Sequence, residues 1–257
     1  MQHRHQNRWA GFSLSCAHYA ESMVLLDLSS ARRKQRDDPV TAKELAGLRG
    51  LLGQLMWLAT QVVPQLQAPL SLLLGYLGVA TVSTLLEANK LARRALVWAQ
   101  TPLRTFVHEE MSVVGWSDAS WACRREGSSQ GGYIIGVANK TFLEQAESPI
   151  SVISWHSGKL ARVARSSNSA ELQAAADAEG ELSYIRLSLR ELVGETIPLQ
   201  RWQEAAAQIP SVLVLDSRGV YDALARSESA CLGLKDKRSG LEASSLKRSL
   251  VETRCGL

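Results

Sequence analysis

The sequence predicts an α/β protein in which a mixed sheet with flanking helices follows a small all-helical segment. Two observations lead to this fold class. Through the first half, from Thr41 onward, apolar residues recur at helical spacing. After Thr105 the pattern changes to short runs that alternate with period two, followed by a long helical stretch, one more strand and two helices. Three antiparallel strands joined to such an α–β unit form a mixed sheet covered by helices.

The helical segment is expected over residues 41–105. It opens with a Thr-x-x-Glu capping box, in which Thr41 and Glu44 satisfy the first free amides of a helix. Residues 1–40 contain the charge run ARRKQRDD at 31–38, and we expect this part to be a solvated N-terminal tail or linker. The expected helices cover residues 42–60, a stretch from about residue 70 into the 80s, and 88–100.

The second half, residues 106–257, is expected to form one domain built on the sheet. Its apolar runs are short and rich in Val, Ile and Trp, as is typical of strands, and one helical pattern exceeds 25 residues. The expected strands are 111–120, 131–139, 149–155 and 211–216, and the expected helices are 167–193, 217–226 and 236–252.

Composition excludes several classes of protein. Of the 257 residues, 46% are hydrophobic and 21% are charged, which excludes disorder, collagen and a coiled coil. The net charge of +4 permits a polyanionic partner without requiring one. The four cysteines form no CxxC pair, which argues against a zinc knuckle or a disulfide scaffold. We therefore expect an intracellular protein, cytoplasmic or nuclear.

One long segment, residues 51–86, contains no charged residue. An apolar run of about 20 residues can span a bilayer, so a membrane hairpin is one interpretation. Four glutamines and two prolines interrupt the segment, and buried amphipathic helices explain the same pattern. On hydropathy alone both interpretations stay open, as does a helical protein that docks a partner through this segment.

Three acidic residues occupy positions where burial patterns predict apolar ones. Asp118 and Asp216 each lie where an expected strand ends, and ligands bind at such strand ends in open α/β sheets. Glu171 lies on the stripe of the long helix that faces the sheet, and every other member of the stripe is apolar. The stripe consists of Glu171, Ala175, Ala178, Leu182, Ile185, Leu189 and Leu192. Asp177, Glu179 and Glu181 lie off or beside it and are expected in solvent.

Each carboxylate has an ordinary structural explanation, because Asp caps helices and Glu near a helix start favours the helix dipole. The joint placement of the three carboxylates is not explained in this way, and it indicates a metal site. Three carboxylates within about 4 Å would repel one another by several kcal/mol per pair, and divalent cations would remove this cost. Oxygen ligands without His or Cys favour Mg²⁺ or Mn²⁺. We therefore expect Asp118, Glu171 and Asp216 to meet at a metal site. Asp236, at the start of the last helix, is a fourth candidate, and helix-dipole stabilisation explains it equally well.

Four blocks of sequence resemble one known domain. They are GWSDASWA (115–122), SSQGGYIIG (128–136), ISWHSGKLARVARSSNSAELQAA (153–175) and VLDSRGVYDAL (214–224). Together they resemble the ribonuclease H domain of Copia-type (Ty1/copia) LTR retrotransposon Pol polyproteins. LRGLLGQLMWLATQVVPQL (48–66) is similar to the segment that connects the polymerase palm of those polyproteins to the ribonuclease H domain. With this context the membrane interpretation recedes.

The resemblance implies an RNase H-like fold and Mg²⁺-dependent endonucleolytic cleavage of RNA in RNA–DNA hybrids by a two-metal mechanism. Asp118, Glu171 and Asp216 would be the catalytic and metal-binding residues, with Asp236 as the fourth member. The palm aspartates are absent from the sequence, so no polymerase activity is implied. In the family a final strand follows the last helix; the chain stops at Leu257 before it, and we expect an unpaired sheet edge.

The resemblance also implies partners: the RNA–DNA hybrid and the remainder of a Pol polyprotein. Basic and polar residues around the start of the long helix can hold phosphates and a 2′-hydroxyl, and a solvated loop explains them equally well. These candidates are Lys159, Arg162, Arg165, Ser167 and Asn168. The alternative function is that of a catalytically inactive, nucleic-acid-binding remnant of such a polyprotein, in which the carboxylates are retained.

Overall fold

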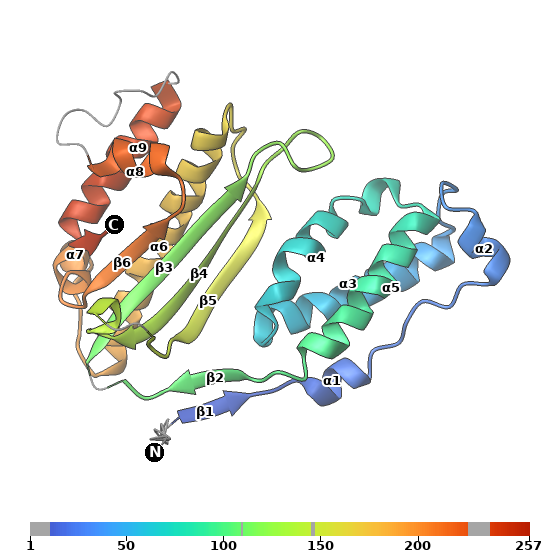
Figure 1. The fold of residues 1–257 in the computed structure, drawn as a ribbon, viewed down its shortest axis with the longest axis horizontal. Helices are drawn as coiled ribbons and strands as arrows, with labels where there is room; N and C mark the ends of the chain where they lie inside the picture. Colours follow the sequence, from blue (N-terminus) through green and yellow to red (C-terminus); the bar gives the residue numbers. More distant parts are fainter. Residues whose placement is uncertain (1–10, 109, 145–146, 226–236) are drawn as a thin grey trace, which may run out of the picture.

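The computed structural model describes residues 11–108, 110–144, 147–225 and 237–257, which form a mostly helical part and a part built on a sheet (Figure 1). We call residues 11–106 the helical unit and residues 110–257 the sheet unit. The helical unit contains α1 (Ala17–Glu21), α2 (Ser30–Lys34), α3 (Ala42–Gln61), α4 (Gln67–Leu74) and α5 (Val82–Trp98), with short 3₁₀ turns at Pro64–Leu66 and Leu77–Val79.

The expected capping box begins α3. The Thr41 hydroxyl accepts a hydrogen bond from the backbone N–H of Glu44, and the Thr41 N–H donates to the Glu44 carboxylate at 2.8 Å. Leucines of α3 then pack against α4 and α5 in the core of the helical unit. No helix among the described residues has the length and apolar character needed to cross a bilayer. Burial within the helical unit accounts for much of the uncharged run at 51–86.

The structure differs from the tail or linker expected over residues 1–40. From α1 onward the chain packs on the helices, and Ala20, Met23 and Leu28 are buried in the same core as α3. The charge run is partly engaged, because Arg32 donates to the Glu44 carboxylate at 2.9 Å. Strand β1 (Gly11–Leu14) pairs antiparallel with β2 (Leu103–Phe106). Apolar residues such as Ala20, Met23 and Leu28 recur before the charge run and are buried in the helical core, which explains why residues 17–40 fold instead of forming a tail.

The sheet unit contains a five-stranded mixed sheet in the order β5-β4-β3-β6-β7. Strands β3, β4 and β5 are antiparallel and β6 joins β3 in parallel, which makes the mixed sheet that the sequence predicts. The strands are β3 (Met111–Ser120), β4 (Gln130–Asn139), β5 (Ser151–Lys159), β6 (Ser211–Leu215) and β7 (Cys255–Gly256). The helices are α6 (Ser167–Leu192), α7 (Trp202–Ala206), α8 (Arg218–Ala225) and α9 (Lys237–Glu252), with 3₁₀ turns at Phe142–Glu144 and Leu199–Arg201.

The edge beyond β6 also differs from the prediction. The sequence leads us to expect that β6 ends the sheet unpaired, whereas β7 pairs with it in parallel, Cys255 opposite Ser211 and Gly256 opposite Val212. A turn after α9, in which Arg254 has a positive φ of 52°, brings the chain back to the sheet. Two residues are enough to cover the start of β6.

The main core of the sheet unit lies between the sheet and α6. Ala175, Ala178 and Leu182 of the predicted stripe are fully buried, and a side chain at Gly115 of β3 would contact Leu182. The stripe ends earlier than predicted, because Leu192 is 82% exposed in the last turn of α6. Glu179, expected in solvent, is buried, and its carboxylate accepts a hydrogen bond from Ser183.

Candidate metal centre

Two of the predicted acidic residues are neighbours because β3 and β6 run in parallel. Ser117 of β3 lies opposite Leu215 of β6, so the next residues along each strand, Asp118 and Asp216, come side by side. Both are exposed, which leaves this end of the sheet open to solvent. Glu171 approaches from the first turns of α6, whose start is fixed by Ser166, since the Ser166 hydroxyl accepts a hydrogen bond from the Ser169 N–H at 3.2 Å.

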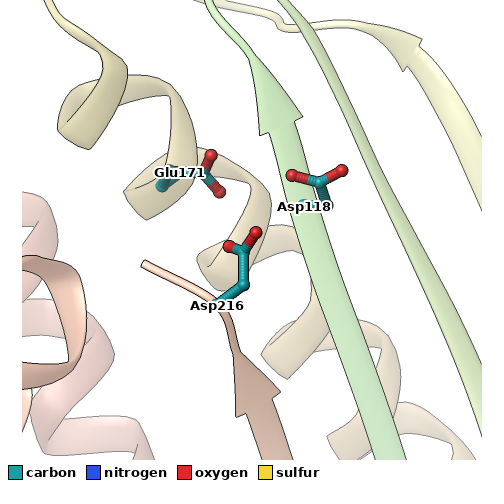
Figure 2. A group of neighbouring side chains, drawn as sticks. All are labelled: Asp118, Glu171 and Asp216. Atoms are coloured by element: carbon teal, nitrogen blue, oxygen red, sulfur yellow. The ribbon is translucent and has the colours of Figure 1, made fainter. Parts of the chain in front are cut away.

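The three carboxylates converge as the sequence predicts. One oxygen from each of Asp118, Glu171 and Asp216 lies within 4.8 Å of the other two. Figure 2 shows the three side chains reaching toward a common point from β3, α6 and the residue after β6. Three separate elements therefore meet at one all-oxygen cluster, which is the donor set that hard divalent cations prefer.

Glu171 is the electrostatically strained member of the cluster. Burial, and then the negative charges of Asp118 and Asp216, raise the pKa of Glu171 to about 7. The backbone N–H of Ala119 donates to the Glu171 carboxylate, which opposes the rise and holds the side chain against β3. A divalent cation would supply the positive charge that this cluster lacks, and it would favour the ionised carboxylate.

The structure places the predicted nucleic-acid-binding residues on one segment, from the end of β5 to the first turn of α6. All five are exposed: Lys159, Arg162, Arg165, Ser167 and Asn168. Ser167 and Asn168 precede Glu171 by four and three residues, so they share its side of the helix. Arg162, however, forms an ion pair with Glu242 of α9, so its charge is partly compensated within the protein. Asp236 lies outside the described residues.

A groove next to the cluster was not expected from the sequence. It has a volume of about 290 Å³ and runs from Asp118 to the turn between α3 and α4. Its helical wall consists of Pro64, Gln65, Gln67 and Ala68, and its sheet wall includes Trp116, Ile134, Trp155 and Ser157. These walls are about 50 to 90 residues apart in sequence, and no local pattern signals that they meet.

Comparison of the chain with protein-family models, with curated proteins and with solved structures finds no match. The case for a function therefore depends on the residues and their arrangement.

Proposed function

We propose that this protein is a Mg²⁺-dependent ribonuclease of the RNase H type, which cleaves the RNA strand of RNA–DNA hybrids. The observation that carries the proposal is the convergence of Asp118, Glu171 and Asp216 from three elements at the open end of parallel strands. The order of the elements supports it: three antiparallel strands, a long helix, then a strand parallel to the first. The Copia-type sequence blocks carry these same three acidic residues.

In this proposal Asp118, Glu171 and Asp216 hold two Mg²⁺ ions. When bound, two such ions activate a water and stabilise the leaving oxygen in phosphodiester hydrolysis. The Ala119 N–H positions the Glu171 carboxylate. Ser167 and Asn168, exposed one turn before Glu171, offer hydrogen bonds to a sugar 2′-hydroxyl, the group that distinguishes RNA from DNA. Lys159 and Arg165 offer charge to phosphates along the same segment.

The test is cleavage of a labelled RNA–DNA hybrid with Mg²⁺, with duplex DNA and duplex RNA as control substrates. We expect cleavage of the RNA strand of the hybrid alone, and loss of at least a hundredfold in rate in Asp118→Asn and Glu171→Gln, on the scale of lost metal activation. Asp222→Asn is the matched control, since Asp222 is a partly exposed aspartate of α8 with only a 3.9 Å ion pair to Arg218.

Two results would contradict the proposal. Cleavage that persists in EDTA or in Asp118→Asn would place the chemistry elsewhere. Tight binding of the hybrid by the unmodified protein with no cleavage at any Mg²⁺ concentration would favour a binding protein that has kept the carboxylates.

A further inference from the structure

The groove beside the carboxylate cluster has a flat apolar floor. Trp116 of β3 lies opposite Ile134 of β4, and Ile134 lies opposite Trp155 of β5, so the three side chains share one face of the sheet. Ile134 is 43% exposed although it sits in a central strand. The face is therefore uncovered here, and two indole rings are available within the groove.

Beside this apolar row, the next row of the sheet has small side chains and leaves a hollow in the floor of the groove. It consists of Asp118, Gly132 and Ser157, which lie opposite one another across the same three strands. A side chain at Gly132 would meet the carbonyl oxygen of His156 at 2.8 Å, so this position takes glycine. The hollow thus begins at a residue of the carboxylate cluster and continues toward the aromatic row.

Hydrogen bonds between the two units and within the helical unit hold the opposite wall in place. The Trp155 indole N–H donates to the carbonyl oxygen of Ala59 at 2.7 Å, and the Gln67 amide donates to the same oxygen at 3.3 Å. Arg124, in the loop after β3, donates to the hydroxyl and the carbonyl of Ser71 in α4, at 3.0 Å each. The groove is consequently preformed, which lowers the entropy cost of filling it.

The chemistry of the lining selects the occupant. Among the described residues that line the groove there is no Lys or Arg, so a phosphate would find no permanently charged cation there. It offers indole faces and the amides of Gln65 and Gln67, which are partners for the face and the edge of a nucleobase. Its volume of about 290 Å³ is at the small end of ligand pockets and far too small for a duplex.

From these observations we propose that the groove binds one unpaired nucleobase next to the scissile phosphate, which metal ions at Asp118, Glu171 and Asp216 would hold. This inference rests on the proposed function and adds a substrate preference to it. The protein cleaves hybrids preferentially beside a mismatched or unpaired nucleotide, because only an unpaired base can leave the duplex and enter the groove. The helical unit thereby contributes to substrate selection.

The first experiment compares cleavage of a fully paired hybrid with hybrids that carry one mismatch, moved stepwise along the RNA. We expect one mismatch position to raise the rate about tenfold, the scale of one base stacked on an aromatic ring. Ala68→Phe fills the groove from its exposed wall and should bring the ratio of the two rates close to one. Leu72→Phe, four residues along α4 and outside the lining, should keep the ratio.

The second experiment does not depend on activity. The Glu171→Gln protein is mixed with a hybrid that carries 2-aminopurine at the mismatch position, and we expect its fluorescence to be quenched as the base stacks on Trp116 or Trp155. Ala68→Phe in the same background should remove the quenching, and Leu72→Phe should preserve it.

Each failure has its own meaning. Equal cleavage of paired and mismatched hybrids at every position, with no quenching, overturns the nucleobase site and leaves the proposed ribonuclease intact. Equal loss of both rates in Ala68→Phe would mean that the strand backbone occupies the groove, which also overturns the site. A protein that cleaves no hybrid overturns the proposed function itself, whatever the fluorescence shows.

Discussion

The indole N–H of Trp155 donates a 2.7 Å hydrogen bond to the carbonyl oxygen of Ala59. Trp155 lies in β5, and Ala59 lies in the last turns of α3, so the bond joins the sheet unit to the helical unit. The contact between Arg124 and Ser71 of α4 joins the same two units at a second point. Side chains in both units therefore have defined partners across the boundary.

Replacing Trp155 with Phe should weaken this connection. The substitution keeps an aromatic ring and removes the donor, and the Gln67 amide still satisfies the Ala59 oxygen. We expect the free energy of unfolding to fall by about 0.5–1.5 kcal/mol, the value of one hydrogen bond. Urea titration measures the loss, and hydrogen exchange should quicken at α4 amides.

Trp121→Phe is the control for this prediction. The Trp121 indole N–H also donates to a carbonyl oxygen, that of Ala164 at 3.0 Å, but both residues belong to the sheet unit. This variant should lose similar stability without faster exchange in α4. Unchanged α4 exchange in Trp155→Phe would show that the bond does not couple the units.

Replacing Asp118 with Asn should stabilise the metal-free protein. The change keeps the shape of the side chain and removes one of three converging negative charges, so it relieves repulsion on Glu171. We expect the melting temperature in EDTA to rise. Added Mg²⁺ should raise the melting temperature of the unmodified protein more than that of the variant, since bound ligand stabilises the folded state.

Asp222→Asn again serves as the control, and its melting temperature should respond to Mg²⁺ like that of the unmodified protein. If Asp118→Asn melts lower in EDTA, the Asp118 carboxylate has a stabilising partner, and repulsion within the cluster is not its main interaction.

Patterns that depend on local chemistry were predictable from the sequence. The capping box of Thr41 and Glu44 is formed, and period-two alternation located β3 with Asp118 near its end. Glu171 was identifiable because a lone acid stood on an apolar stripe. Its meeting with Asp118 and Asp216 could be expected because both aspartates lie where strands end and Glu171 lies on the face of its helix that is turned toward the sheet.

Features that depend on contacts between distant segments were not predictable in this way. The charge run at 31–38 reads as solvated, because the pairing of Arg32 with Glu44 requires a particular turn of the chain. The groove needs Pro64–Ala68 to meet Trp116. Arg186 offered no signal, since arginine is rarely fully buried, and here it is.

The pair formed by Arg32 and Glu44 makes stability depend on acid pH. Hydrogen bonds from Arg32 and from the Thr41 N–H hold the pKa of Glu44 down at about 2, against 4.5 for an ordinary Glu. A folded pKa below the unfolded one stabilises the protein above about pH 4.5, and this contribution is lost as the pH falls toward 2. Both side chains are about one-fifth exposed, so solvent screens part of the effect.

Glu44→Gln should therefore destabilise the protein by about 1–2 kcal/mol at pH 7, and the difference from the unmodified protein should vanish near pH 2. Urea titrations across this pH range measure it. Glu87→Gln is the control, because the pair of Glu87 with Lys90 is more than half exposed and should contribute little. A difference between Glu44→Gln and the unmodified protein that stays constant with pH would contradict the linkage.

Arg186 holds the starts of β6 and β7, at the end of the sheet away from the carboxylate cluster. Its guanidinium, fully buried, donates from Nε to the carbonyl oxygen of Ile209 at 2.9 Å and from Nη2 to that of Thr253 at 2.5 Å. Ile209 precedes β6, and Thr253 precedes β7, so one side chain of α6 fastens the starts of both strands. Burial lowers the pKa of Arg186, and the nearby Glu179 opposes this effect.

Arg186→Met should loosen the β6–β7 edge of the sheet. Methionine fills much of the space but leaves the two carbonyl oxygens without donors, and each unsatisfied buried group costs about 1–3 kcal/mol. We expect the free energy of unfolding to fall by about 2–4 kcal/mol, measured by urea titration, with faster hydrogen exchange at β6 and β7. Arg201→Met, which removes an exposed pair with Glu204, should leave the free energy of unfolding nearly unchanged. Since Asp216 directly follows β6, the loosened edge should also weaken the Mg²⁺-induced rise in melting temperature, while Arg201→Met keeps it. A stable Arg186→Met protein with unchanged exchange at Cys255 would mean that packing alone positions β7.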